Sequence, residues 1–259
     1  MLKLIQITDS HLGVNHGDTL LSMNPDDSLV DVLTLINLQQ SDIDLVLATG
    51  DIANDASLAA YQRFYTTVTD HLLAPLVWLP GNHDDHEMME AILPGSQHRV
   101  VYKDPWLVVM LDSHVPGEIH GSFAKAELNF LARVLARHPQ LHILVCLHHQ
   151  PVPVGSQWMD RYIVQNAHAF WETISPYNNV KAVIWGHVHQ HFDEYYNDIR
   201  LLSSPSTCIQ FAPEQQDFTL DTTMPGYRWL HLHNDGTLET GIERVPEKDY
   251  GIDFNSQGY

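Results

Sequence analysis

Apolar runs of strand length alternate with helix-like patterns through the first three quarters of the chain. Six runs rich in apolar and β-branched residues predict buried strands: Leu2–Thr8, Asp44–Thr49, Ala74–Pro80, Trp106–Leu111, His142–Leu147 and Val180–Trp185. The segments between them have apolar positions at helical spacing and predict helices: Ser28–Gln40, Ser57–Leu73, Glu87–Leu93, Phe123–Ala136 and Val164–Ile174. Asp27 or Ser28 is the expected N-cap of the first helix. This alternation predicts an α/β fold with parallel strands in its interior.

The last quarter of the chain has a different pattern. Four runs there predict strands joined by tight turns: Phe192–Tyr196, Ile199–Leu202, Tyr227–His233 and Leu238–Arg244. The stretch Ser203–Pro225 has little periodicity, and so long a loop in a compact domain usually has a function. Because no low-complexity linker divides the chain, we expect one domain over residues 1–259. Its parts are a core over about 2–191, the C-terminal strands and a substrate-pocket loop over about 192–245, and a tail over 246–259.

Composition and charge exclude several functional classes. The net charge is −19, from 13 basic and 32 acidic residues, which argues against binding to nucleic acid. A small phosphorylated substrate remains compatible if bound cations supply positive charge locally. The apolar runs are far shorter than the roughly 20 residues of a membrane span, and no signal peptide is expected. Cys146 and Cys208 are too few for a disulfide framework, so we expect a cytoplasmic protein.

Five of the predicted strands run directly into residues that bind metals. In chain order these residues are Asp9 and His11, then Asp51, then Asn82 with His83 and Asp84, then His148 and His149, and finally His187 and His189. Ligands of α/β proteins bind at the carboxyl ends of the strands, so the five segments should meet at one edge. In extended backbone, residues i and i+2 point to the same side, which would let each D-x-H or H-x-H pair aim two ligands at one place.

Each motif alone is ordinary, and only their combination predicts a metal site. The donors are imidazole, carboxylate and amide without thiolate, which suits Mn²⁺, Fe²⁺, Fe³⁺ or Zn²⁺. Alternation lets only one of His148 and His149 face the site. Asp112-Ser113-His114 repeats the first triplet, and a turn or supporting role is expected for it. Gly50, Gly81 and Gly186 each precede a ligand, where a sharp turn favours a residue without Cβ.

In this order, the motifs D-x-H, G-D, G-N-H-D, H and G-H-x-H resemble the signature of the calcineurin-like metallophosphoesterases. Within that family the chain is most similar to the class III cyclic-nucleotide phosphodiesterases. The motifs cover Leu2 to about His191, and the segments LHHQPVPVGSQWMD and DFTLDTTMPGYRWLHLHNDGTLET extend the resemblance almost to the C-terminus. The resemblance implies a four-layer αββα sandwich, in which two mixed β-sheets pack face to face with helices outside.

The resemblance also implies a dinuclear metal centre. One divalent ion, Fe²⁺ or Mn²⁺ with Zn²⁺ possible, would be held by Asp9, His11, Asp51 and His189. The other would be held by Asp51, Asn82, His148 and His187, so that Asp51 bridges the two. The family pattern favours His148 over its neighbour. The residues expected to contact substrate are Asn82, His83 and His11.

The implied activity is hydrolysis of 3′,5′-cyclic AMP to 5′-AMP by attack of a metal-bridging hydroxide on phosphorus. His83 follows a ligand directly, so we expect it to donate a hydrogen bond or proton to the phosphate or leaving oxygen, oriented by Asp84. A broader phosphodiesterase acting on glycerophosphodiesters or nucleotide diphosphates is the main alternative. A non-catalytic scaffold and a metalloprotease are weaker ones, because the ligand set is complete and no HExxH helix is present. The expected partner is a small molecule, without nucleic acid or membrane, and the protein is a monomer or a dimer.

Overall fold

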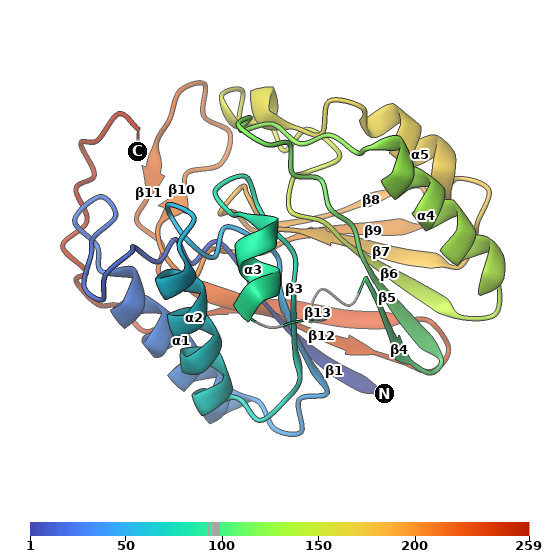
Figure 1. The fold of residues 1–259 in the computed structure, drawn as a ribbon, viewed down its shortest axis with the longest axis horizontal. Helices are drawn as coiled ribbons and strands as arrows, with labels where there is room; N and C mark the ends of the chain where they lie inside the picture. The colour runs from blue at the N-terminus through green and yellow to red at the C-terminus, as the bar shows by residue number, and fades with distance from the viewer. Residues whose placement is uncertain (93, 95–98, 259) are drawn as a thin grey trace.

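Two mixed β-sheets packed face to face form the centre of the protein (Figure 1). The computed structural model describes residues 1–92, 94 and 99–258. The five-stranded sheet has the order β13 (Leu238–Arg244), β12 (Gly226–Leu232), β1 (Leu2–Ile7), β2 (Leu45–Ala48) and β3 (Leu76–Trp78). The six-stranded sheet has the order β4 (Val100–Lys103), β5 (Trp106–Met110), β6 (His142–Cys146), β7 (Val180–Trp185), β9 (Ile199–Ser203) and β8 (Phe192–Tyr196).

Strand directions confirm the parallel interior expected from the sequence. β1, β2 and β3 run parallel to one another, as do β5, β6, β7 and β9. The remaining pairs are antiparallel: β12 with β1 and β13, β4 with β5, and β8 with β9. Both sheets are therefore mixed.

Five helices cover the outer faces of the sheets. α1 (Pro25–Gln39), α2 (Leu58–His71) and α3 (His86–Ile92) lie on the side of the five-stranded sheet, and α4 (Lys125–Arg137) and α5 (Ala167–Ile174) lie on the side of the six-stranded sheet (Figure 1). The cores follow the strand period of two: Ile5 packs under the helices, whereas Leu4 lies between the sheets. The α/β class and the four-layer αββα sandwich are confirmed.

Several boundaries differ from the prediction for local reasons. α1 begins at Pro25, because the side chain of Asn24 caps it by accepting a hydrogen bond from the backbone N–H of Asp26. The expected caps, Asp27 and Ser28, are therefore wrong, and Ser28 instead donates from its hydroxyl to the carbonyl of Thr207.

The long stretch before β12 and the helix before β7 also differ from expectation. Within 203–225 lie two short paired strands, β10 (Gln210–Phe211) and β11 (Leu220–Asp221). The helix expected from Val164 starts at Ala167 and is preceded by a 3₁₀ turn, Met159–Tyr162. Strand β4 was not predicted, and Leu93, the expected end of α3, lies outside the described residues.

Two buried polar side chains fix the position of one sheet against the other. Gln6 on β1 donates to the carbonyl of Trp185 on β7 over 3.0 Å, and it accepts from the hydroxyl of Ser204 over 2.5 Å. Arg228 on β12 is fully buried and donates to the carbonyl of Ser203 at the end of β9 over 2.7 Å. These bonds fix how the two sheets lie relative to each other, and so they fix the relative positions of the side chains at the edge that the sheets share.

Candidate metal centre

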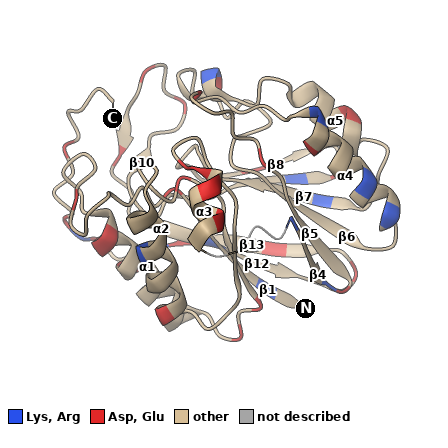
Figure 2. Cartoon of the chain, in the orientation of Figure 1, with Lys and Arg blue, Asp and Glu red and all other residues tan. Residues whose placement is uncertain are grey.

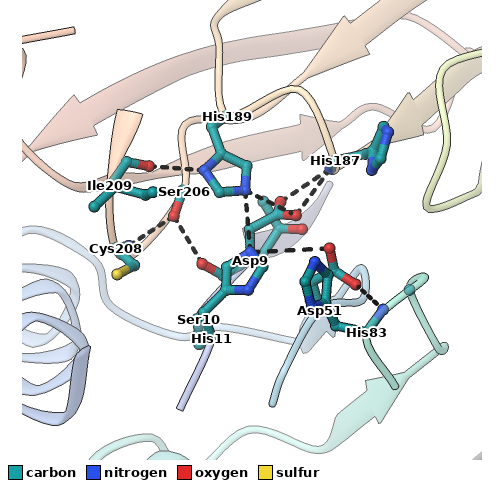
Figure 3. A network of polar contacts seen from close by, with 12 residues as sticks. Asp9, Ser10, His11, Asp51, His83, His187, His189, Ser206, Cys208 and Ile209 are labelled. Atoms are coloured by element: carbon teal, nitrogen blue, oxygen red, sulfur yellow. Dashed lines mark hydrogen bonds and ion pairs between the residues drawn. The ribbon is translucent and has the colours of Figure 1, made fainter. Parts of the chain in front are cut away.

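Both sheets deliver metal-binding side chains to the same end of the sandwich. Residues 9–11 follow β1, Asp51 follows β2 and residues 82–84 follow β3, whereas His148 follows β6 and residues 187–189 follow β7. Asp9, His11, Asp51 and His189 gather around one place in Figure 3, and each is at most 2% exposed. The structure therefore brings together groups from five separate segments, as the strand-end argument predicts.

The backbone at these candidate ligands is not extended. Five of them have a positive φ: Asp9 (54°), His11 (47°), Asp51 (48°), His187 (64°) and His189 (48°). The i, i+2 alternation offered for the two pairs is therefore the wrong mechanism, although the pairs do converge. In left-handed backbone a non-glycine residue costs roughly 1 kcal/mol or more, a cost that is tolerated mainly at functional sites.

Backbone carbonyls fix the orientation of the ligand imidazoles. His189 donates from Nδ1 to the carbonyl of Ile209 over 2.8 Å, and His148 donates from Nδ1 to the carbonyl of Thr49 over 2.8 Å. Because a carbonyl only accepts, the proton lies on Nδ1 and the lone pair of Nε2 is left for the centre.

The side-chain nitrogen and oxygen atoms that face the centre form two overlapping groups. In the first, His11 Nε2 lies 3.2 Å from His189 Nε2, which lies 3.4 Å from Asp9 Oδ1. In the second, Asp51 Oδ2 lies 3.3 Å from His148 Nε2, and the same oxygen lies 3.8 Å from His11 Nε2. One oxygen of Asp51 thus faces both groups, which is the geometry that a bridging carboxylate requires.

The donor set fits two cations. His187 Nε2 is buried and has no hydrogen-bond partner among the described residues, a costly state unless the atom has another partner. Two imidazole nitrogens that face each other at 3.2 Å likewise need a proton or a cation between them. Imidazole and carboxylate donors without thiolate suit Mn²⁺, Fe²⁺ and Zn²⁺.

Electrostatics also favour cation binding at this place. Burial opposes ionisation of Asp51, but the His148 and His83 imidazoles hold the pKa of its carboxyl well below the ordinary value. Burial lowers the pKa of His148, and Asp51 more than offsets this and raises it to about 9. Burial and neighbouring imidazoles lower the pKa of His11 and His187. At neutral pH Asp51 is therefore ionised and His11 and His187 are neutral, which is the state that binds a metal, whereas His148 carries a proton that a bound cation would displace.

Two glycines are required because ligand side chains pass over them. A Cβ on Gly81 would lie 2.7 Å from Asp51 Cγ, and a Cβ on Gly186 would lie 2.7 Å from Asp9 Oδ2. Both distances are shorter than contacts that real Cβ atoms make. The glycines expected for sharp turns therefore have a further role, which is to leave room for a carboxylate from another strand.

The geometry favours His148 over His149 as the ligand. A ring nitrogen of His149 lies within 4.8 Å of one in His148 and one in His187, but both of its nitrogens have other partners. Nδ1 accepts from the hydroxyl of Ser113 over 2.8 Å, and Nε2 donates to the carbonyl of Ile119 over 3.1 Å. The repeated triplet at Asp112 thus has the supporting role expected for it, through Ser113.

The role expected for Asp84 needs correction. Its carboxylate accepts hydrogen bonds from the backbone N–H groups of Ile52 and Ala53, each over 3.1 Å, and of Gly81 over 2.9 Å. Burial and the neighbouring Asp51 raise its pKa to about 6. Asp84 therefore joins the loops after β2 and β3.

His83 is oriented by a backbone carbonyl instead of Asp84. Its Nδ1 donates to the carbonyl of Asn54 over 2.7 Å, and its backbone N–H donates to Asp51 Oδ1 over 2.9 Å. The His83 ring packs edge-on against His11, with ring centroids 4.9 Å apart. Backbone and side chain together hold the ring beside the ligands.

A cavity of about 460 Å³ opens beside the centre. Asp51, Asn82, His83 and His187 form one end of it, while the fully buried His11 is not among its lining residues, so the expected substrate contact by His11 has no support in the cavity. Its other walls consist of Gly117–Ile119, Trp158, Met159, Tyr162, Phe211, Phe218, Gln257 and Gly258. The sequence patterns did not identify these residues individually.

Among its described lining residues the cavity has no Lys or Arg, and it includes the acidic residues Asp51 and Glu118. Figure 2 shows further acidic residues on α1 and α3. An anionic substrate therefore needs positive charge from bound cations.

Comparisons with known proteins agree with this geometry. Residues 2–191 match the calcineurin-like phosphoesterase family. The chain is 44% identical over 99% of its length to the 3′,5′-cyclic adenosine monophosphate phosphodiesterase CpdA of Pseudomonas aeruginosa, of which it covers 94%. It is 41% identical over its full length to the protein of the same description from Escherichia coli (strain K12), of which it covers 95%.

Solved structures share the fold. The chain superposes on a dimetal phosphatase from Danio rerio with a TM-score of 0.65 and 14% identity, covering 95% of this chain and 99% of that one. No helix among the described residues has the length and apolar character needed to cross a membrane.

Proposed function

This chain belongs to the calcineurin-like phosphoesterase family, and on that basis we propose that it hydrolyses 3′,5′-cyclic AMP to 5′-AMP at the metal centre. The observation that carries phosphodiester hydrolysis is the convergence of imidazole and carboxylate groups from both sheets beside a cavity with no Lys or Arg among the lining residues that the structure describes. The nucleotide itself comes from the relatives that match the chain along almost its whole length.

We assign the ligands as the resemblance implied. Asp9, His11, Asp51 and His189 hold one cation, and Asp51 with Asn82, His148 and His187 holds the second. When bound, two divalent ions supply Lewis acidity for the phosphodiester and a water of lowered pKa. We propose that both ions are Fe²⁺ or Mn²⁺, with Zn²⁺ as the alternative.

His83 supplies a proton at the substrate. Because Nδ1 donates to the carbonyl of Asn54, the ring can donate from Nε2 only when both nitrogens carry a proton. Nε2 then hydrogen-bonds to a phosphate oxygen or protonates the departing O3′. Asp84 positions the loops of Asp51 and His83 through its three backbone hydrogen bonds.

The free, buried state of Cys146 and Cys208 is compatible with the cytoplasmic location that we propose. A cyclic nucleotide is the small-molecule partner that the proposal requires.

The test is turnover of cyclic AMP by the purified protein with Mn²⁺ or Fe²⁺, followed by chromatography of the products. We expect 5′-AMP with little 3′-AMP, and no turnover in the presence of a chelator. A glycerophosphodiester and a nucleotide diphosphate serve as comparison substrates. The substrate assignment fails if these are cleaved while cyclic AMP persists, although the family and the metal centre would stand.

A further inference from the structure

Three aromatic side chains form a continuous cluster that begins at His189, in which Phe211 is buried and Trp158 and Phe218 are half-buried. Phe211 stacks on the His189 imidazole, with ring centroids 4.2 Å apart and planes 10° from parallel. Trp158 packs edge-on against Phe211 with centroids 5.0 Å apart, and against Phe218 with centroids 5.2 Å apart. We name Trp158, Phe211 and Phe218 the aromatic wall, and all three line the cavity.

Hydrogen bonds hold the two segments that carry the aromatic wall against the metal centre. The side chain of Gln190, which follows the ligand His189 directly, donates to the hydroxyl of Ser156 over 3.2 Å and to the carbonyl of Ala212 over 3.3 Å. The backbone N–H of Gln157 donates to the carbonyl of Gln215 over 2.8 Å. These hydrogen bonds therefore fix the distance between the metal ligands and the aromatic wall.

The cavity thus has an end for an anion and an aromatic side. At one end, the metal ligands and His83 would contact the phosphodiester of a substrate. The aromatic wall starts beside this end, because Phe211 stacks on His189. A nucleotide has the same division, since a charged phosphate and a flat aromatic base are joined through one ribose. Aromatic side chains bind bases through their faces, and stacking is worth about 1–3 kcal/mol per base by alanine substitution.

We infer that the aromatic wall binds the nucleobase and selects cyclic nucleotides over phosphodiesters that lack a base. This inference rests on the proposed function and deepens it. Since every base has a π-face, the wall recognises bases as a class, and discrimination among them is weak. Glycerophosphodiesters have no flat aromatic base that can stack on the wall.

The experiment compares two substrates that share the reacting ring. Cyclic AMP is measured against methyl β-D-ribofuranoside 3′,5′-cyclic phosphate, which keeps the ribose and the cyclic phosphate but has no base. The variants are Phe218→Leu, which keeps apolar bulk and removes the ring, and Trp158→Leu. Tyr102→Leu is the matched control, because Tyr102 is 60% exposed on β4 and is absent from the cavity lining.

Wild-type protein should have a kcat/KM for cyclic AMP about 5- to 150-fold above that for the base-free substrate, the factor that one to three kcal/mol of stacking gives. Phe218→Leu and Trp158→Leu should raise KM for cyclic AMP several-fold and leave the base-free reaction and its kcat unchanged. Tyr102→Leu should change neither reaction.

Equal kcat/KM values for the two substrates in wild-type protein would overturn the inference. This test needs no variant, so the inference can be refuted even if the variants fail to fold. Equal losses on both substrates in a folded Phe218→Leu protein would also overturn it. Hydrolysis of the base-free substrate without hydrolysis of cyclic AMP would remove the proposed function as well. The two failures are therefore distinguishable.

Discussion

Replacing Gly81 by alanine tests whether the position of the Asp51 carboxylate, the proposed bridge, sets the activity. The added Cβ would lie 2.7 Å from Asp51 Cγ and 2.5 Å from its backbone nitrogen. Since carbon atoms pack at about 3.5–4.0 Å, the carboxylate must move by roughly 0.8 Å or more. Misplacement of about 1 Å in an active site can cost around 10²-fold in rate, whereas overpacking costs the fold about 1–3 kcal/mol.

We therefore expect Gly81→Ala to fold and to lose about 10²-fold in kcat at saturating metal, with a modest loss of stability. The control is Gly17→Ala. Gly17 has a φ of +87° and nothing within 4 Å of an added Cβ, so alanine there costs only local backbone strain.

The assays are cyclic AMP turnover by chromatography, metal content per chain, and thermal unfolding of both variants with bound metal. A loss of activity in Gly81→Ala that exceeds any loss in Gly17→Ala at similar stability supports the geometry. Turnover of Gly81→Ala within twofold of wild type would refute it, because the carboxylate would then tolerate the displacement.

Three further predictions concern the metal centre. Asp51→Asn removes the negative charge that two cations share, so elemental analysis should find fewer than two metals per chain and activity should be lost. Two metals per chain with normal turnover would show that Asp51 does not bridge the metals. His83→Ala should keep both metals while kcat falls about 10²–10⁴-fold, and loss of metal would make His83 a ligand instead. A chelator should lower the unfolding temperature by about 10–20 °C from that in metal at a hundredfold excess over both Kd values, because each of the two cations that join the sheets stabilises the folded protein by about 2.7 kcal/mol. Calorimetry that shows no shift would contradict that coupling.

The sequence predicted the place of the site because strand-end motifs need little tertiary information. Apolar strands that run into Asp51 and His187 must deliver these residues to the edge where parallel strands end. The orientation of each ligand depends on distant partners such as Ile209 and Thr49, and no local pattern predicts those contacts.

The errors have the same cause. The D-x-H spacing suggested extended backbone, but the loops after the strands fold into left-handed conformations that the surrounding structure imposes. Asp84 adjoins His83 in sequence, yet its carboxylate points to backbone N–H groups of two loops. The aromatic wall joins Trp158 to residues more than fifty positions later, and although two segments that extend the family resemblance contain Trp158 and Phe218, no local pattern brings these rings together.

The pairing of β1 with β12 has a consequence for synthesis on the ribosome. Leu2 on β1 lies opposite Leu232 on β12, 230 positions later, so one edge of β1 has no partner until β12 has been made. At about 5–20 residues per second, that apolar edge waits roughly 10–45 s, during which it can pair with other chains. Nascent chains that do not yet contain β12 should therefore need a chaperone more than the finished protein does.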